Sequence, residues 1–198
     1  FVSEIFLSVG AGLVFFSTDY VFIGFEIIPF WPNENPSPIS LYGESKLAGE
    51  KNVIASGVDL LLIRTSWLYG AVGRGFVPTV IKRAHEGRGL RLVADQIGSP
   101  TWAMNVARAA IDLVSYEASG IYHLSDAGET SWYEFGEQIL SILGIKAKIE
   151  PISSEAWGAP AARPRYSVLD STKAEELLGR RMTPWREALK TFLKEEFK

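Results

Sequence analysis

The stretch Tyr42-Gly43-Glu44-Ser45-Lys46-Leu47-Ala48-Gly49-Glu50 decides how this chain folds. It follows a proline-rich loop, and Ser40 is placed to cap it, so we predict a helix that runs to about Ser56. On that helix Tyr42 and Lys46 lie one turn apart on the same face. A lysine ammonium at that spacing stabilises the phenolate form of a tyrosine, and the helix N-terminus acts in the same direction. The pair is therefore a candidate proton donor for a carbonyl group undergoing reduction.

The Tyr-x-x-x-Lys spacing alone does not decide the function, because a buried tyrosine beside a solvated lysine gives the same pattern. The upstream sequence adds information. Leu13 to Phe16 is a continuous apolar run that ends at Ser17, Thr18 and Asp19. Such a run predicts a parallel strand covered on both faces, with hydroxyls and a carboxylate at its carboxyl end.

A second buried strand is predicted at Val58–Arg64, after the helix. Strand, helix and strand with short turns form the βαβ pattern of a parallel sheet. Ligands bind to such sheets at the carboxyl ends of the strands. Thr18, Asp19, Ser66 and Trp67 all fall at those ends, so we expect one crevice to hold them.

The rest of the chain continues this alternation, so the predicted fold class is α/β. A helix from Ser131 is indicated by a capping box with Glu134 and by an apolar stripe. The other expected elements are helices at residues 1–9, 76–86, 104–116, 171–178 and 184–197, strands at 90–94, 120–125 and 148–152, and loops at 22–41, 95–101 and 153–167.

Four ordered blocks of sequence carry a family resemblance. They are Ser17–Phe22, Tyr42–Glu50, Arg64–Gly70 and Asp95–Thr101. Together they resemble the extended short-chain dehydrogenase/reductases and, within these, the dTDP-4-dehydrorhamnose reductases, over nearly the whole chain. The chain departs from the family at Ile23, where an acidic residue is usual, and this leaves the local pocket chemistry open.

The resemblance implies a partial Rossmann-type parallel sheet with helices on both faces, plus a smaller carboxyl-terminal substrate-binding region. Residues 1–70 would be the second part of a Rossmann dinucleotide-binding domain. Residues 71–198 would be mainly substrate-binding, with 103–125 returning to the Rossmann sheet.

A nicotinamide enzyme of this kind needs a glycine-rich turn whose amides hold the cofactor pyrophosphate. Neither Gly10-Ala11-Gly12 nor Gly73-Arg74-Gly75 has the third glycine or the right context. The family places that turn well before the Ser17 block. We therefore expect this chain to correspond to the carboxyl-terminal two-thirds of a reductase and to be inactive, with no useful NADPH binding, by itself.

The activity implied by the resemblance is reduction of the C4 ketone of dTDP-4-dehydro-6-deoxy-L-mannose by NADPH, or NADH, to dTDP-L-rhamnose for surface polysaccharides. Tyr42 would supply the proton, Lys46 would stabilise its phenolate and bind the nicotinamide ribose, and Thr18 would orient the ketone. Ser17 would join Tyr42 and Lys46 in binding the cofactor. The expected substrate-binding residues are Thr18, Asp19, Tyr20, Trp67, Gln96 and Thr101.

Several alternatives stay open. Trp67 could simply pack against a loop, although related epimerases and dehydratases typically carry Asn near this position. The segment 95–101 could be a plain turn rather than a pocket wall. Arg163, Arg165 and Trp157 either meet the diphosphate or base, or lie on the surface. The other function classes are a nucleotide-sugar epimerase or dehydratase, and a regulatory subunit like that of methionine adenosyltransferase.

Composition excludes several classes of protein. The absence of cysteine excludes disulfides and thiolate sites, and a net charge of −3 argues against nucleic-acid binding. The uncharged run of 14 residues from Ile5 to Thr18 is too short for a membrane span, so we expect no membrane contact. A chain without cysteine fits a cytoplasmic protein, which is the expected location. The isolated His85 and His123 form no metal motif, so no metal ligand is predicted. A role for Mg²⁺ and a homodimer are left open.

Overall fold

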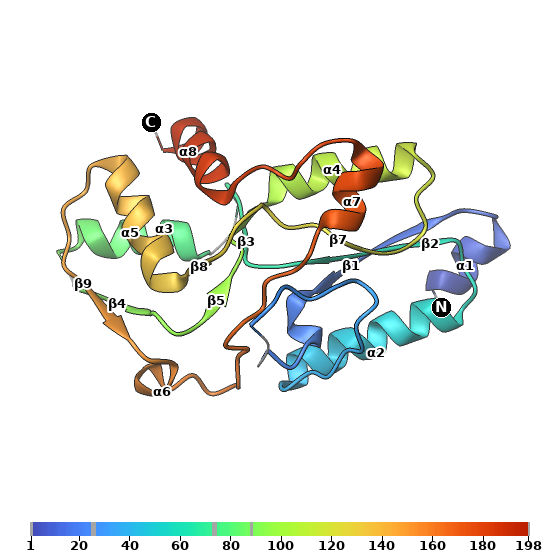
Figure 1. The fold of residues 1–198 in the computed structure, drawn as a ribbon, viewed down its shortest axis with the longest axis horizontal. Helices are drawn as coiled ribbons and strands as arrows, with labels where there is room; N and C mark the ends of the chain where they lie inside the picture. The colour runs from blue at the N-terminus through green and yellow to red at the C-terminus, as the bar shows by residue number, and fades with distance from the viewer. Residues whose placement is uncertain (1, 25–26, 73–74, 88, 198) are drawn as a thin grey trace.

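The computed structural model describes residues 2–24, 27–72, 75–87 and 89–197, so Gly73 and Arg74 lie outside the described residues. Figure 1 shows an elongated molecule with a parallel sheet in one half and a second group of helices and strands in the other. The sheet has the order β1-β2-β7 and consists of β1 (Leu13–Thr18), β2 (Leu60–Thr65) and β7 (Gly120–His123).

The register of this sheet sets the position of the site. β1 and β2 pair in parallel from Leu13↔Leu60 to Thr18↔Thr65, so both strands end at the same edge. β2 is buried along nearly its whole length, which explains its continuous apolar sequence. Polar residues appear where these strands end, at the edge where parallel sheets bind ligands.

Helix α2 (Leu41–Ala55) connects β1 to β2 and begins where the sequence predicts. The Ser40 hydroxyl accepts a hydrogen bond from the Gly43 amide and so caps it. Gly43 lies against the 3₁₀ helix η1 (Asp19–Val21): a Cβ at this position would lie 2.2 Å from the Tyr20 carbonyl oxygen. The missing side chain therefore allows the first turn of α2 to approach the end of β1.

The opposite face of the sheet is covered by α4 (Ala103–Ser115) and α7 (Thr172–Leu178). Their side chains form a core with those of β2 and β7, including Ile63, Ala109 and Leu113, each 0% exposed. The sheet is thus covered on both faces, as Figure 1 shows, with α2 and the short α1 (Val2–Ser8) on the other side. The α/β fold class is confirmed.

The second half of the molecule has its own core. It is built on Phe135, Ile139, Leu189 and Phe192, each 0% exposed, and on Trp185, 1% exposed. Its elements are α3 (Phe76–His85), α5 (Trp132–Leu143), α8 (Trp185–Glu196) and the parallel pair β4 (Leu90–Val93) and β9 (Ile149–Ile152). The predicted capping box of Ser131 and Glu134 starts α5.

Two short ladders lie between the halves. β3 (Leu68–Tyr69) pairs with β6 (Thr101–Trp102) in parallel, and β5 (Ile97–Gly98) pairs with β8 (Thr130–Ser131) antiparallel. Because β3 follows β2 directly, these ladders join the edge where β1 and β2 end to the second half. The domain boundary at residue 70 stays a prediction.

The expectation of an unbroken loop at 153–167 is wrong in part, because α6 (Ser154–Trp157) forms there. Ser153 caps this helix by accepting from the Ala156 amide. The Ser154 amide and hydroxyl both donate to Asp95 Oδ1 at 2.7 Å, a contact across 59 residues that local sequence does not reveal.

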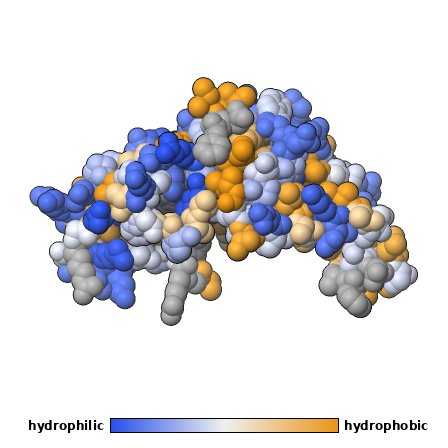
Figure 2. Space-filling model, turned by 90° about the horizontal axis from the view of Figure 1, so that it is seen from below, coloured by the Kyte–Doolittle hydropathy of each residue, from blue (hydrophilic) through white to orange (hydrophobic). Residues whose placement is uncertain are grey.

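Apolar and polar side chains divide the surface unevenly. Seen from below, the face in Figure 2 gathers hydrophobic residues over the centre and the sheet half, while the opposite end is largely hydrophilic. The exposed apolar residues of the loop at 22–41 include Ile27, Ile28 and Trp31.

A buried ion pair fixes that loop to the sheet. Arg64 in β2 is 2% exposed and Glu50 in α2 is 1% exposed. Arg64 donates to both Glu50 carboxylate oxygens, at 3.0 and 2.7 Å, and its Nη1 donates to the Pro32 carbonyl oxygen at 3.1 Å. The bidentate geometry satisfies both charges in a site without water access.

Glu50→Ala should lower the free energy of unfolding by about 3–5 kcal/mol, because it leaves the Arg64 guanidinium buried without its carboxylate. Arg181→Ala breaks an ion pair with Glu175 in which the arginine is 87% exposed, and it serves as the control. That control should change the free energy by less than about 1 kcal/mol. Urea unfolding measures both values, and equal losses would contradict the role assigned to the buried pair.

Candidate active site

A cavity of about 260 Å³ opens at the carboxyl ends of β1 and β2. The structure brings together Thr18, Asp19, Tyr20, Tyr42 and Trp67, all of them predicted site residues. The complete lining in the described residues is Thr18, Asp19, Tyr20, Tyr42, Thr65, Ser66, Trp67, Leu68 and Trp132.

Tyr42 projects from the first turn of α2 at the rim of this cavity. Its side chain is 54% exposed, so its hydroxyl is accessible to a ligand. Its ring meets that of Tyr20 edge to face, with centroids 5.8 Å apart. Burial, followed by the charge of Asp19, raises the pKa of Tyr20 to about 12. Tyr20 therefore stays neutral and acts as a support for Tyr42.

Lys46 reaches back to the end of β1. Its Nζ donates to the Phe16 carbonyl oxygen at 3.0 Å and lies 5.4 Å from the centroid of the Phe15 ring. An ammonium has three donors, so two remain for a ligand. Ser17 follows Phe16 in the chain, and its Oγ is buried and has no hydrogen-bond partner among the described residues. Both groups could donate to a bound cofactor.

A hydrogen bond joins the side chains of Thr18 and Asp19. Thr18 Oγ1 donates to Asp19 Oδ1 at 2.9 Å and accepts from the Tyr20 amide at 3.3 Å. Burial raises the pKa of Asp19 from its ordinary 3.8 to about 7, against the lowering effect of hydrogen bonds that include the one from Thr18. When Asp19 is protonated, its carboxyl can donate instead, and the Thr18 proton becomes available to a substrate oxygen.

Trp67 stands at the end of β2 with a backbone φ of 43°, in the left-handed region that non-glycine residues rarely adopt. Its indole stacks on that of Trp132, with centroids 3.6 Å apart and planes inclined by 6°. Trp132 was not among the predicted site residues. It follows an ordinary helix cap, and no spacing in the sequence links it to Trp67.

The remaining two predicted substrate residues lie outside this cavity. Gln96 is 4% exposed, and its Nε2 donates to Ser154 Oγ at 2.9 Å. Thr101 is 0% exposed; its hydroxyl donates to the Ser99 carbonyl oxygen and accepts from the Asp126 amide. Gln96 lines a second cavity, whereas Thr101 lines neither of the two.

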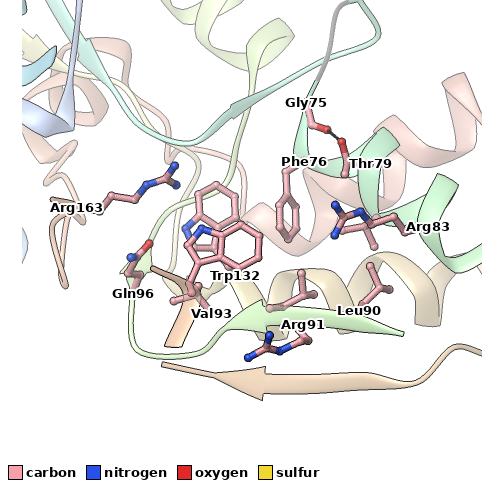
Figure 3. A pocket seen from close by; sticks show the side chains of 13 residues that line it. Gly75, Phe76, Thr79, Arg83, Leu90, Arg91, Val93, Gln96, Trp132 and Arg163 are labelled. Carbon is pink, nitrogen blue, oxygen red and sulfur yellow. Dashed lines mark hydrogen bonds between the residues drawn. The ribbon is translucent and has the colours of Figure 1, made fainter. Parts of the chain in front are cut away.

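The second cavity, of about 450 Å³, lies between α3, α5 and β4. It combines aromatic rings with arginines, and no carboxylate is found among the described lining residues. Figure 3 shows Arg83 and Arg163 on opposite sides of the Phe76 and Trp132 rings. In the part of the chain that the structure describes, neither arginine forms an ion pair. The cavity is therefore suited to an anionic ligand with a flat ring.

Trp132 lines both cavities, so the two are neighbours across one side chain. The lining of the second cavity is Gly75, Phe76, Thr79, Val80, Arg83, Leu90, Arg91, Leu92, Val93, Gln96, Trp132, Trp157 and Arg163. Arg163 and Trp157, left open by the sequence, lie here. Arg83 and Arg91 were missed because a basic helix end and a charged residue in a strand carry no signal of a binding role.

No metal centre emerges from the described residues, which contain no group of three or more His, Cys, Asp or Glu side chains able to hold an ion. His123 is 0% exposed, and its Nδ1 lies 3.0 Å from the Phe30 carbonyl oxygen. Burial, followed by the charge of Arg64, lowers its pKa to about 3.

None of the helices in the described ranges is long and apolar enough to cross a membrane.

Comparison with known proteins connects these features. Residues 2–197 match the model of the RmlD substrate binding domain family. The chain is 43% identical to the Bacillus subtilis spore coat polysaccharide biosynthesis protein SpsK, over 94% of this chain and 65% of that protein. It is 35% identical to a dTDP-4-dehydrorhamnose reductase of Burkholderia thailandensis, over 91% of this chain and 66% of that one.

A solved structure is also similar. The dTDP-4-dehydrorhamnose reductase of Bacillus anthracis, determined in complex with NADP, superposes with a TM-score of 0.94 at 40% identity. The match covers 98% of this chain and 69% of that one. The chain thus spans about two thirds of the length of the curated relatives that it matches.

Asp19→Asn should flatten the dependence of stability on pH. Because the folded state raises the pKa of Asp19 to about 7, its contribution is fully present below about pH 4 and is lost as the pH rises through 7. We expect the wild-type chain to lose on the order of 3 kcal/mol more than the variant between pH 4 and pH 8. Urea unfolding at both pH values measures this difference.

The exposed Asp59 provides the control, because Asp59→Asn removes a carboxylate that remains in water. That variant should retain the wild-type pH dependence. If Asp19→Asn retained it as well, Asp19 would not be the group that titrates near pH 7.

Proposed function

The chain belongs to the RmlD substrate binding domain family, and we propose that it forms the catalytic and substrate-binding part of a dTDP-4-dehydrorhamnose reductase. The reaction would reduce the C4 ketone of dTDP-4-dehydro-6-deoxy-L-mannose to give dTDP-L-rhamnose. One observation carries this proposal: Thr18, Tyr42 and Trp67 line a small cavity that adjoins a larger, arginine-lined cavity through Trp132.

The proposed cofactor is NADPH, supported by the NADP bound to the Bacillus anthracis relative. The residues present fit its nicotinamide ribose: Lys46 has two unused donors, and the buried Ser17 hydroxyl lacks a partner among the described residues. Tyr42, Lys46 and Ser17 would hold this end. When bound, NADPH supplies the hydride that reduces the ketone carbon.

The chain's own residues would manage the proton. The Tyr42 hydroxyl would protonate the carbonyl oxygen, and the Lys46 ammonium would stabilise the phenolate that remains. Thr18 would hydrogen-bond the same oxygen, using the proton that becomes available when the buried Asp19 carboxyl is protonated. Positioned proton transfer of this kind contributes roughly 10²–10⁴-fold to a rate.

The larger cavity would hold the nucleotide. A diphosphate carries negative charge that Arg83, Arg91 and Arg163 can meet with planar, multiply donating guanidinium groups. Trp157 and Phe76 offer flat apolar surfaces to a base. The sugar would then extend past Trp132 into the smaller cavity, so a dTDP-sugar would occupy both. A diphosphate in this cavity would explain why arginines without carboxylate partners among the described residues lie beside a site for a neutral ketone.

Tyr42→Phe should lower kcat by about 10²–10⁴-fold with little change in KM, because it removes the proton and keeps the ring. The test uses a joined reductase, in which this chain follows the glycine-rich NADPH-binding unit of a relative. Oxidation of NADPH in the presence of the keto sugar is followed at saturating substrate.

Tyr20→Phe is the matched control, since the same hydroxyl is removed from the ring that contacts Tyr42. It should retain most of kcat. A Tyr42→Phe variant with more than half of the wild-type kcat would exclude Tyr42 as the proton donor.

Arg163→Ala and Arg83→Ala should each weaken the binding of dTDP to the 198-residue chain by about tenfold or more, the size of one lost charge-assisted contact. Isothermal titration gives the Kd. Arg108→Ala, which removes a guanidinium 6.0 Å from the Trp102 ring and outside both cavities, should leave Kd unchanged. Equal effects in all three variants would point to general charge attraction rather than a diphosphate site.

A further inference from the structure

We propose that Trp132 is a positioning residue for the sugar, which acts by clamping the Trp67 indole against Gly98 and so fixes which part of the indole faces the substrate. The inference rests on the proposed function, because it concerns the same sugar cavity. It assigns a role to Trp132 and to the glycine of the segment Asp95–Thr101.

The clamp begins with a strained backbone. Trp67 has a φ of 43°, in the left-handed region that residues other than glycine rarely adopt. Its carbonyl oxygen accepts from the Thr101 amide at 3.2 Å, and the neighbouring Ser66 hydroxyl donates to the Ser99 carbonyl oxygen at 3.1 Å. The end of β2 is thus tied to the segment that contains Gly98, and strain of this kind is typically retained where a side chain must point in one direction.

Trp132 covers one face of the Trp67 indole. The two ring planes are nearly parallel, inclined by 6°, and the ring centroids are 3.6 Å apart. Phe76 in turn contacts Trp132, at 4.7 Å between centroids, and supports it from the second cavity. Trp132 therefore lies between the two cavities with little freedom to move away from Trp67.

Gly98 lies against the same indole. A Cβ at this position would fall 2.4 Å from Trp67 Cε2 and 2.6 Å from Nε1, closer than any real contact. Trp132 covers one face of the indole, and Gly98 packs against the ring at Cε2, Nε1 and Cζ2. The antiparallel pair β5–β8 enforces this arrangement: Gly98 pairs with Thr130, two residues before Trp132.

Trp132 and Gly98 therefore leave a sugar in the small cavity only the part of the Trp67 indole that neither of them covers. The position of that part depends on both partners, since a missing ring at 132 lets the indole rotate and an added methyl group at 98 forces it aside. Trp132 and Gly98 therefore act on the sugar through Trp67, whereas the nucleotide binds elsewhere.

The experiment compares two ligands that differ only in the sugar. The Kd values of dTDP-L-rhamnose and of dTDP are measured by isothermal titration for the 198-residue chain, and their ratio gives the gain from the sugar. Trp132→Ala and Gly98→Ala should each reduce this gain about five- to tenfold, as expected for loss of one aromatic contact. Trp132→Phe, which keeps an aromatic face, should restore most of it.

Arg83→Ala is the matched control. It alters a lining residue of the nucleotide cavity that forms no ring contact with Trp132 or Trp67, so it should weaken the binding of both ligands alike and preserve the ratio of their Kd values. Thermal melting of each variant by circular dichroism checks that Gly98→Ala and Trp132→Ala remain folded.

The outcomes test the clamp and the sugar site separately. If Trp67→Ala loses the gain from the sugar while folded Trp132→Ala and Gly98→Ala retain it, the clamp is refuted and the proposed function stands. If the wild-type chain binds dTDP-L-rhamnose no more tightly than dTDP, the sugar site itself is refuted, and the clamp with it. Loss in both clamp variants with rescue by Trp132→Phe supports the proposal.

Discussion

The parallel pairing of β1 with β2 is the constraint on which the rest of the site depends. Because Thr18 pairs with Thr65, the hydroxyl and carboxylate that follow β1 and the tryptophan that follows β2 arrive at one edge of the sheet. Gly43 then lets α2 approach that edge closely enough to bring Tyr42 beside Tyr20. A slip of one residue in the β1–β2 register would turn the side chains of the shifted strand to the other face and separate them from those of its partner. Backbone geometry, rather than any single polar contact, therefore assembles the chemistry.

The charged side chains fall into paired and unpaired groups that lie in different places. Arg64 and Glu50 are buried and paired with each other, and Arg64 also binds the Pro32 carbonyl oxygen of the loop at 22–41. Asp19 is buried without a cationic partner in the described chain, and burial raises its pKa to about 7. Its carboxyl group is therefore partly protonated and partly ionised near neutral pH. Arg83, Arg91 and Arg163 are exposed and lack carboxylate partners among the described residues. The buried paired charges stabilise the fold, whereas the exposed unpaired arginines are accessible to an anionic ligand.

Sequence reasoning succeeded where the information is local and periodic. The apolar runs of β1 and β2, the cap at Ser40 and the one-turn spacing of Tyr42 and Lys46 all act within a few residues, and the structure has these elements where they were expected. It failed where contacts join distant segments. Trp132 reaches Trp67 only through the β5–β8 ladder, and α6 is held by Asp95 from 59 residues away. Thr101 shows the converse limit: a residue in a family motif has its hydroxyl occupied by Ser99 and Asp126, inside the protein.

The central claim is that one dTDP-sugar spans the two cavities, with its sugar at Tyr42 and its diphosphate among the arginines. A crystal structure of this chain bound to dTDP-L-rhamnose tests that claim most directly. We expect the sugar C4 oxygen within roughly 2.6–3.2 Å of the Tyr42 hydroxyl, the distance that proton transfer requires. We also expect phosphate oxygens in contact with Arg83 or Arg163 and the sugar in contact with Trp67. A nucleotide bound outside the arginine-lined cavity, or a sugar that leaves the Tyr42 cavity empty, would contradict it.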